Sequence, residues 1–99
     1  MSTEMYAVIF KATIKDIDDQ YFVLAKKMRD LACKEYNCLD FVSVCENNQE
    51  ISISYWNEES DITRWKENRE HLNVQRLAKE KWYQSYSVEI VKVIRSYSK

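Results

Sequence analysis

The chain contains no glycine and no proline among its 99 residues, and this absence narrows the folds open to it. P-loop and Rossmann proteins bind nucleotide phosphates with glycine-rich loops, so nucleotide binding of those two kinds is excluded. Tight turns must instead be made by Asn, Asp and Ser, which tolerate the left-handed backbone region best after glycine. Any hairpin in this fold therefore needs one of these residues at its turn.

Composition indicates an ordinary globular domain, with 45% hydrophobic and 31% charged residues. A formal net charge of −1, with no basic stripe interleaved with aromatics, argues against a nucleic-acid partner. No apolar run approaches the roughly 20 residues that span a bilayer, and the start MSTEMYAV lacks the features of a signal peptide. We expect a single cytoplasmic domain over residues 1–99, with its core at about 5–97 and no membrane partner.

The three cysteines do not indicate a metal centre. Cys33, Cys38 and Cys45 have no histidine nearby, and their spacing fits no zinc pattern. We interpret them as reduced and mostly buried small hydrophobic residues. No metal site is expected.

Hydrophobic periodicity predicts the element order β-α-β-β-α-β. The strands are expected over residues 5–13, 39–46, 50–56 and 85–97, where apolar, β-branched and aromatic residues concentrate. A long amphipathic helix is expected over 17–36, with Asp16 as its N-cap and Asn37 ending it.

The other turns can be placed as well. Asn47 and Asn48 can supply a tight hairpin turn without glycine. A second helical region capped by Ser60 or Asp61 is expected to continue to Trp82, with a bend between residues 68 and 73.

This order predicts a ferredoxin-like α+β fold, in which both helices cover one face of a four-stranded antiparallel sheet. The strands are apolar on both faces: in the first, Tyr6, Val8 and Phe10 alternate with Ala7 and Ile9. Two helices can cover only one face, and the other would be an aggregation liability in water. We therefore expect a homodimer that packs sheet against sheet.

Residues 55–86 contain an unusual concentration of aromatic side chains around the only histidine, His71. This composition favours a pocket for a small aromatic molecule. His71 has an ordinary pKa near 6.5, so it is the natural catalytic base or hydrogen-bond donor. Gln75 lies one helical turn further on and shares its face, while Trp65 and Trp82 can wall a planar ligand.

Other polar and aromatic contacts remain open. Only one of Tyr55 and Trp56 can face the helices, and Asn57 follows directly. Either Tyr83 or Tyr86 can donate a hydrogen bond to a substrate oxygen. In the competing interpretation these aromatics are core packing, and His71 and Gln75 are solvent-exposed or satisfy the backbone at the bend.

The pattern of Tyr55-Trp56, Trp65, His71, Gln75, Trp82-Tyr83 and Tyr86 resembles the antibiotic biosynthesis monooxygenase domain family, particularly its small stand-alone bacterial members. The resemblance spans about residues 5–97. It implies a dimeric α/β barrel made of two ferredoxin-like protomers. Some members of that family oxidise electron-rich polycyclic phenols with dioxygen and without metal, flavin or haem, so no cofactor is expected.

Two alternatives to such an oxygenase remain. The first is a non-catalytic dimeric module that binds a hydrophobic metabolite, and the second is haem binding or degradation. Haem-degrading relatives carry an asparagine on the first strand, which this chain lacks, and their histidine lies further beyond the helix tryptophan than the six residues from Trp65 to His71. These departures disfavour haem degradation.

Overall fold

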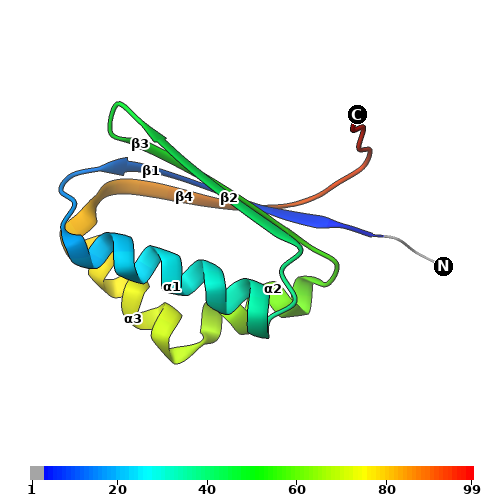
Figure 1. Ribbon diagram of the computed structural model, residues 1–99, viewed down its shortest axis with the longest axis horizontal. Helices are drawn as coiled ribbons and strands as arrows, with labels where there is room; N and C mark the ends of the chain where they lie inside the picture. Colours follow the sequence, from blue (N-terminus) through cyan, green and yellow to red (C-terminus); the bar gives the residue numbers. More distant parts are fainter. Residues whose placement is uncertain (1–3) are drawn as a thin grey trace.

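A computed structural model describes residues 4–99, so the first three residues of the predicted domain lie outside the described range. The elements are β1 (Tyr6–Ile14), α1 (Asp19–Glu35), β2 (Asp40–Glu46), β3 (Gln49–Trp56), α2 (Glu59–Glu67), α3 (Arg69–Leu77), the π-helical turn η1 (Ala78–Trp82) and β4 (Tyr83–Lys92). The strands form an antiparallel sheet in the order β2-β3-β1-β4, and the helices lie on one side of it (Figure 1). The predicted ferredoxin-like α+β fold is confirmed.

The first helix begins later than the sequence predicted. Asp18, rather than Asp16, is the N-cap of α1, and its Oδ1 accepts a hydrogen bond from the backbone N–H of Tyr21 at 2.9 Å. Asn37 follows the helix at φ 64°, in the left-handed region that ends helices. The prediction for Asn37 is therefore confirmed, and the prediction for Asp16 is wrong.

The second helical region is divided in two. Neither Ser60 nor Asp61 is the cap: α2 starts after Glu58, which makes no side-chain capping bond, and the Asp61 side chain instead bonds Arg64 and Asn37. The predicted bend is a break at Asn68, whose backbone at φ −56° and ψ 136° ends α2. The same residue caps α3 by accepting from the N–H groups of residues 70 and 71.

The β2–β3 hairpin turns at Asn47 and Asn48, which have φ values of 52° and 65°. Two adjacent residues with positive φ are the signature of a type I′ turn, so the glycine-free hairpin is confirmed. β4 ends at Lys92, well before the predicted end at Tyr97. Its partner strand β1 begins at Tyr6, so the residues beyond Val93 have no neighbouring strand among residues 4–99 to pair with.

Strand register places the side chains on two faces. Val8 and Trp56 face the helices and form a core cluster with Met28, Ala32, Cys38, Ile62 and Trp65. A second cluster contains Tyr21, Ala78 and Trp82. We call the other side of the sheet the open face; its apolar side chains are those of Ala7, Ile9, Val42, Val44, Ile51, Ile53, Tyr55 and Val91.

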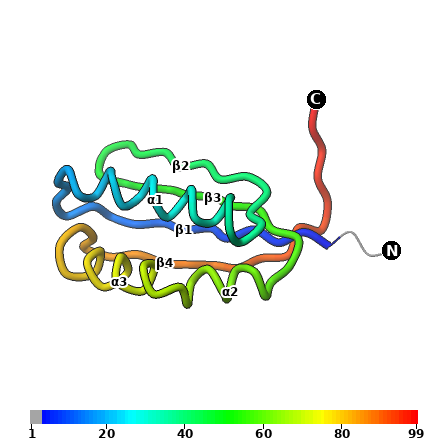
Figure 2. Tube along the Cα trace, turned by 60° about the horizontal axis from the view of Figure 1, so that its bottom comes forward, coloured from blue at the N-terminus to red at the C-terminus, as the bar shows by residue number. Residues whose placement is uncertain are grey.

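The α1 helix and the α2–α3 pair lie next to each other over the same side of the sheet (Figure 2). No helix within residues 4–99 is long and apolar enough to cross a membrane. Of the cysteines, Cys38 is buried as predicted. The prediction is wrong for Cys33, which α1 leaves exposed, and for Cys45, which lies exposed on the edge strand β2.

Candidate functional site

Trp56, Trp65 and His71 form a continuous aromatic cluster between β3 and the helices. The ring centroids of the two tryptophans lie 5.3 Å apart, and His71 meets Trp65 edge to face at 4.3 Å. The indole N–H of Trp65 donates to the Met28 carbonyl at 3.2 Å, while that of Trp56 donates to Ser54 Oγ at 2.8 Å. Both indoles are therefore held in place by packing and by a hydrogen bond.

Gln75 determines which ring nitrogen of His71 carries the proton. Its side-chain Nε2 lies 2.6 Å from His71 Nδ1 and also donates to the backbone carbonyl of Lys66 at 3.1 Å. A carbonyl only accepts, so the amide must present its nitrogen, rather than its oxygen, to this position. Nδ1 of His71 is then an acceptor, and the neutral ring carries its proton on Nε2.

The surroundings of His71 favour the neutral ring. Burial, followed by the positive charge of Lys66, lowers the pKa of His71 to about 4. The ring is thus uncharged at neutral pH, but it is also a weak proton acceptor there. Of the two chemical roles that the sequence left open, base or hydrogen-bond donor, this environment better suits a donor through Nε2–H.

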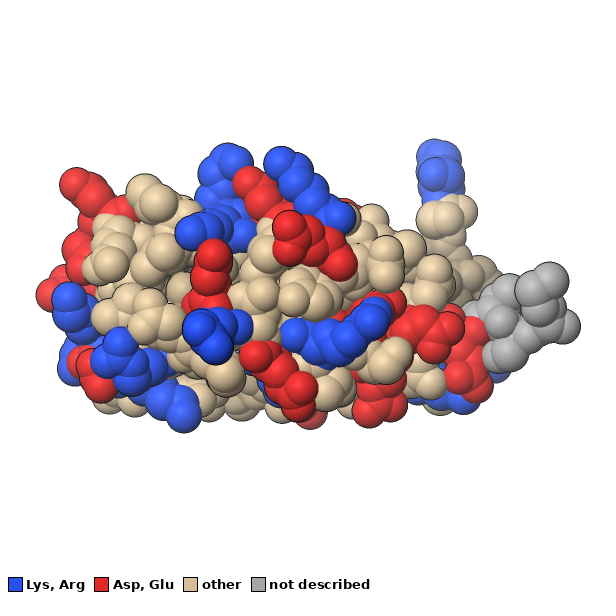
Figure 3. All heavy atoms as spheres, turned by 90° about the horizontal axis from the view of Figure 1, so that it is seen from below, with Lys and Arg blue, Asp and Glu red and all other residues tan. Residues whose placement is uncertain are grey.

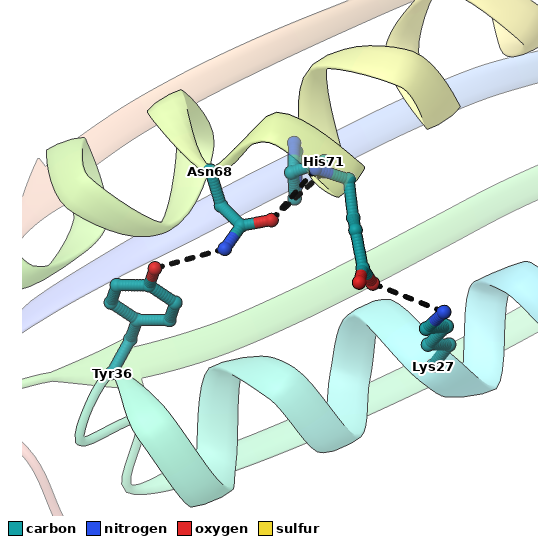
Figure 4. Close-up of polar contacts among 5 residues, drawn as sticks. Lys27, Tyr36, Asn68 and His71 are labelled. Atoms are coloured by element: carbon teal, nitrogen blue, oxygen red, sulfur yellow. Dashed lines mark hydrogen bonds and ion pairs between the residues drawn. The ribbon is translucent and has the colours of Figure 1, made fainter.

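The α2–α3 break holds the backbone of His71 in position (Figure 4). Asn68 Oδ1 accepts from the N–H of Glu70 at 2.9 Å and of His71 at 3.3 Å, and its Nδ2 donates to the Tyr36 hydroxyl at 3.0 Å. Glu70 also forms an ion pair with Lys27 of α1 at 3.1 Å. Two side-chain contacts therefore fix the first turn of α3 against α1.

A second cluster, made of polar contacts, surrounds Glu50, which is only 6% exposed. Its Oε1 accepts hydrogen bonds from the hydroxyls of Tyr21 and of Tyr83, the latter at 2.9 Å, and Ser52 Oγ lies 3.4 Å from Oε2. Burial, with Glu50 as a further cause, raises the pKa of both tyrosines, so they remain protonated donors. Trp82 packs edge to face on Tyr21 at 5.4 Å and donates its indole N–H to Asp18.

The residues that the sequence assigned to one pocket occupy two ends of the sheet. Trp56, Trp65, His71 and Gln75 lie together, whereas Trp82 and Tyr83 belong to the Glu50 cluster. Trp56 and Glu50 are six residues apart on β3, a separation of about 20 Å along a strand. Tyr86 stacks on Phe10 at 5.9 Å, and Asn57 is exposed in the bend after β3.

Two surface hollows lie away from His71. One, of about 260 Å³, is lined mainly by Lys11, Thr13, Gln49, Ser85 and Ser87 on the open face. The other, of about 350 Å³, lies beside the start of α1 between Asp16, Asp18, Lys81 and Trp82. Neither of these two hollows is lined by Trp56, Trp65 or His71.

Sequence comparison relates the chain to one uncharacterised bacterial protein. No family model matches it. Over 91 residues it is 34% identical to the uncharacterised protein YqjZ of Bacillus subtilis (strain 168), covering 91% of this chain and 80% of that protein. The chain belongs to the same family as YqjZ.

Solved structures with the same fold include proteins named as antibiotic biosynthesis monooxygenases. SnoaB, a cofactor-independent oxygenase from Streptomyces nogalater, matches with a TM-score of 0.81 over 99% of this chain and 100% of its own, at 8% identity. Rv0793 from Mycobacterium tuberculosis matches at 0.80 over 95% and 99%, with 13% identity. A further antibiotic biosynthesis monooxygenase matches at 0.76 over 91% and 99%, with 15% identity. The predicted resemblance to this group is confirmed at the level of the fold.

Sequence reasoning missed the Glu50 cluster, and the reason lies in the alternation of β3. Glu50, Ser52 and Ser54 face the helices, while Ile51 and Ile53 face the open side. A row of polar residues on a half-buried strand usually predicts the solvent-facing side, so this pattern predicts the wrong face for Glu50, Ser52 and Ser54. The Tyr36–Asn68 contact was missed too, because nothing in the sequence spacing joins residues 32 positions apart.

Proposed function

We propose that the protein is a cofactor-independent oxygenase that binds a small phenol-type aromatic molecule beside Trp65 and His71 and oxidises it with dioxygen. The observation that carries this proposal is the neutral His71, held in one tautomer by Gln75 and packed against Trp65. The fold that the chain shares with a cofactor-independent oxygenase and an antibiotic biosynthesis monooxygenase supports the reaction class but does not name a substrate.

The chemistry needs little from the protein beyond a suitable environment. A phenol-type substrate gives its proton to solvent water, and the resulting electron-rich anion passes one electron to dioxygen. The substrate radical and superoxide then combine to a peroxide, which loses water and leaves one oxygen atom on the product. The Nε2–H of a neutral imidazole can donate a hydrogen bond to the developing oxyanion, while the Trp65 ring provides an apolar wall that excludes water. This arrangement requires no metal, flavin or haem.

A second candidate, binding of a hydrophobic metabolite without chemistry, is favoured by the packing of the tryptophans. Trp56 is 0% exposed and Trp65 is 7% exposed, so both rings behave as core residues in the ligand-free chain. In this reading the ligand enters by displacing the half-buried His71 ring, and no oxidation follows.

We also propose that the functional unit is a homodimer packed through the open face. Four of its apolar side chains are exposed, and Val42 and Val44 are 52% and 60% exposed. On β3 the polar side chains face the helices, so Ile51 and Ile53 lie on this same side of the sheet, away from the helices. A sheet face with this composition is stable in water when a second sheet covers it.

The decisive experiment measures oxygen consumption with a panel of anthrones, naphthols and hydroquinones, without added metal or flavin. We expect turnover by the wild type and a loss of about 10²-fold or more in His71→Ala, because the oxyanion donor is removed. Tyr86→Phe is the matched control, since its hydroxyl lies outside this cluster, and it should retain wild-type turnover.

Each other outcome assigns a different function. Quenching of tryptophan fluorescence by the same compounds without oxygen uptake supports the binding module and overturns the oxygenase. A change in the haem Soret band on titration with the protein that is lost in His71→Ala supports haem binding instead. If the compounds cause neither fluorescence quenching nor oxygen uptake, the assignment of an aromatic ligand to this cluster is rejected.

A further inference from the structure

The end of α1 brings two cysteines toward each other. Cys33 lies in the last turn of the helix, and Cys38 follows in the segment that leads to β2. Between them Asn37, at φ 64°, reverses the direction of the chain, as a left-handed residue does just beyond a helix. The segment after the turn therefore folds back against the last turn of α1.

Two backbone hydrogen bonds fix this reversal. The carbonyl of Ala32 accepts from the N–H of Tyr36 at 3.2 Å and from the N–H of Cys38 at 3.0 Å. Because Ala32 is bonded directly to Cys33, standard bond lengths then keep the Cα atoms of Cys33 and Cys38 within about 7 Å of each other. A disulfide joins Cα atoms that are about 4.4–6.8 Å apart. A disulfide between these two residues therefore needs little movement of the backbone.

The two side chains also meet. The Cys33 thiol lies within reach of a side-chain hydrogen bond to Cys38, whose Sγ donates to the Asp40 carbonyl at 3.2 Å. Burial, followed by the neighbouring Cys33 thiol, raises the pKa of Cys38 well above the ordinary value of a thiol. Cys38 is therefore a protonated thiol at neutral pH, held next to a second sulfur atom.

The two cysteines differ in their access to solvent. Cys33 is exposed, whereas Cys38 is 7% exposed. On the helix side of the molecule, to which α1 belongs, charged side chains of both signs are interspersed across the surface (Figure 3). Such a mixture is typical of a face in contact with solvent. The reactive thiolate forms more readily at an exposed cysteine than at a buried one, so a dissolved oxidant reacts first at Cys33.

We propose that Cys33 and Cys38 are a thiol pair that hydrogen peroxide or an organic hydroperoxide converts to a reversible disulfide. The Cys33 sulfur attacks the O–O bond and keeps one oxygen as a sulfenic acid, while the other oxygen leaves as water or as the alcohol. The Cys38 sulfur then attacks the sulfenic sulfur, and its proton leaves with the sulfenic hydroxyl as water. The two sulfurs thus supply the two electrons that reduce the peroxide. This inference does not depend on the oxygenase proposed above.

The disulfide would close a loop that contacts the candidate site. Tyr36 lies inside this loop, and its hydroxyl accepts a hydrogen bond from Asn68 Nδ2 at the α2–α3 break. Cys38 itself belongs to the core cluster that contains Trp56 and Trp65. Oxidation of the pair therefore restrains a segment that supports the first turn of α3.

The test is intact mass and non-reducing peptide mapping after treatment with a small excess of hydrogen peroxide. We expect the wild type to lose the mass of two hydrogen atoms, to give a peptide that joins Cys33 to Cys38, and to recover its mass with dithiothreitol. Cys45→Ser is the matched control, because Cys45 is also exposed but lies on β2, and it should form the same disulfide. Cys33→Ser should not form it, and this exposed position tolerates the change without loss of the fold.

Dimedone, which reacts with sulfenic acids, tests the order of the two steps. Cys38→Ser removes the second thiol, so Cys33 should accumulate as a sulfenic acid and be labelled. In Cys33→Ser, labelling of the buried Cys38 should be slower by about tenfold or more. The proposal is overturned if peroxide leaves the wild type reduced, oxidises Cys33 only to sulfinic acid, or links the chain through Cys45. Labelling of Cys38 as fast as that of Cys33 overturns the assigned order.

Discussion

His71 links the candidate site to the pH dependence of folding. Its pKa in the folded chain is about 4, below the ordinary value of 6.5, because burial disfavours the charged ring. The unfolded chain therefore binds the proton more readily between these two values, and stability present above pH 6.5 is lost as the pH falls toward 4. We expect the wild type to lose roughly 2–3 kcal/mol more than His71→Gln across this interval, in urea unfolding followed at several pH values. Equal losses in the two proteins would show that the ring is freely solvated.

Glu50 has no cationic partner in the salt bridges formed by residues 4–99, and the hydroxyls of Tyr21 and Tyr83 donate hydrogen bonds to its buried side chain. Removing one donor leaves a buried acceptor short of a hydrogen bond. Tyr21→Phe should therefore lower the free energy of unfolding by about 1–3 kcal/mol with little change in packing volume. Tyr86→Phe, at an exposed tyrosine, should change it by less than about 0.5 kcal/mol. If both variants unfold at the same urea concentration, the Tyr21 bond contributes nothing.

At the scale of elements, local signals in the sequence predict most of the fold, because turns and helix ends are encoded locally. Asn47 and Asn48 predict the hairpin through their tolerance of positive φ, and Asn37 predicts the end of α1 for the same reason. The predictions that are wrong concern local features, such as helix caps, that contacts with distant residues determine. Asp18 rather than Asp16 caps α1, and its Oδ1 also accepts from the indole of Trp82, 64 residues away. That contact has no trace in the sequence around the helix start.

The α2–α3 break gives the element-scale prediction. Asn68→Ala removes the cap of α3 and the bond to Tyr36, so we expect a loss of about 1–2 kcal/mol in urea unfolding. Asn68→Asp keeps an acceptor at the helix N-terminus, where negative charge is favourable, and loses only the donor to Tyr36. It should lie closer to the wild type than Asn68→Ala. Equal losses would instead indicate that the Tyr36 bond, and not the cap, holds the break.

Over the whole molecule, the sequence contained more information about the two faces of the sheet than about the site. Apolar residues on both faces of β1 and β4 predicted an open face with apolar side chains from alternation alone, since the period of a strand is fixed. The site depends on which tertiary neighbours meet, and there the aromatic residues of one sequence segment separated into two clusters, one with Trp56 and Trp65 and the other with Trp82. Proximity in sequence therefore predicted the Trp65–His71–Gln75 contacts, which lie within ten residues or so, but not the partners of Trp82 and Tyr83.

The open face gives the prediction at this scale. Ile51 lies next to Val44 in the register and is 39% exposed on this face, so Ile51→Glu should place a carboxylate inside the proposed dimer interface. A buried charge without a partner is strongly unfavourable, and we expect the dimer dissociation constant to rise by about 100-fold or more in sedimentation experiments. Val23→Glu introduces the same charge at a 66% exposed valine of α1 and should leave the dimer intact. If Ile51→Glu stays as dimeric as Val23→Glu, the sheets do not pack through this face, and the exposed isoleucines and valines need another explanation.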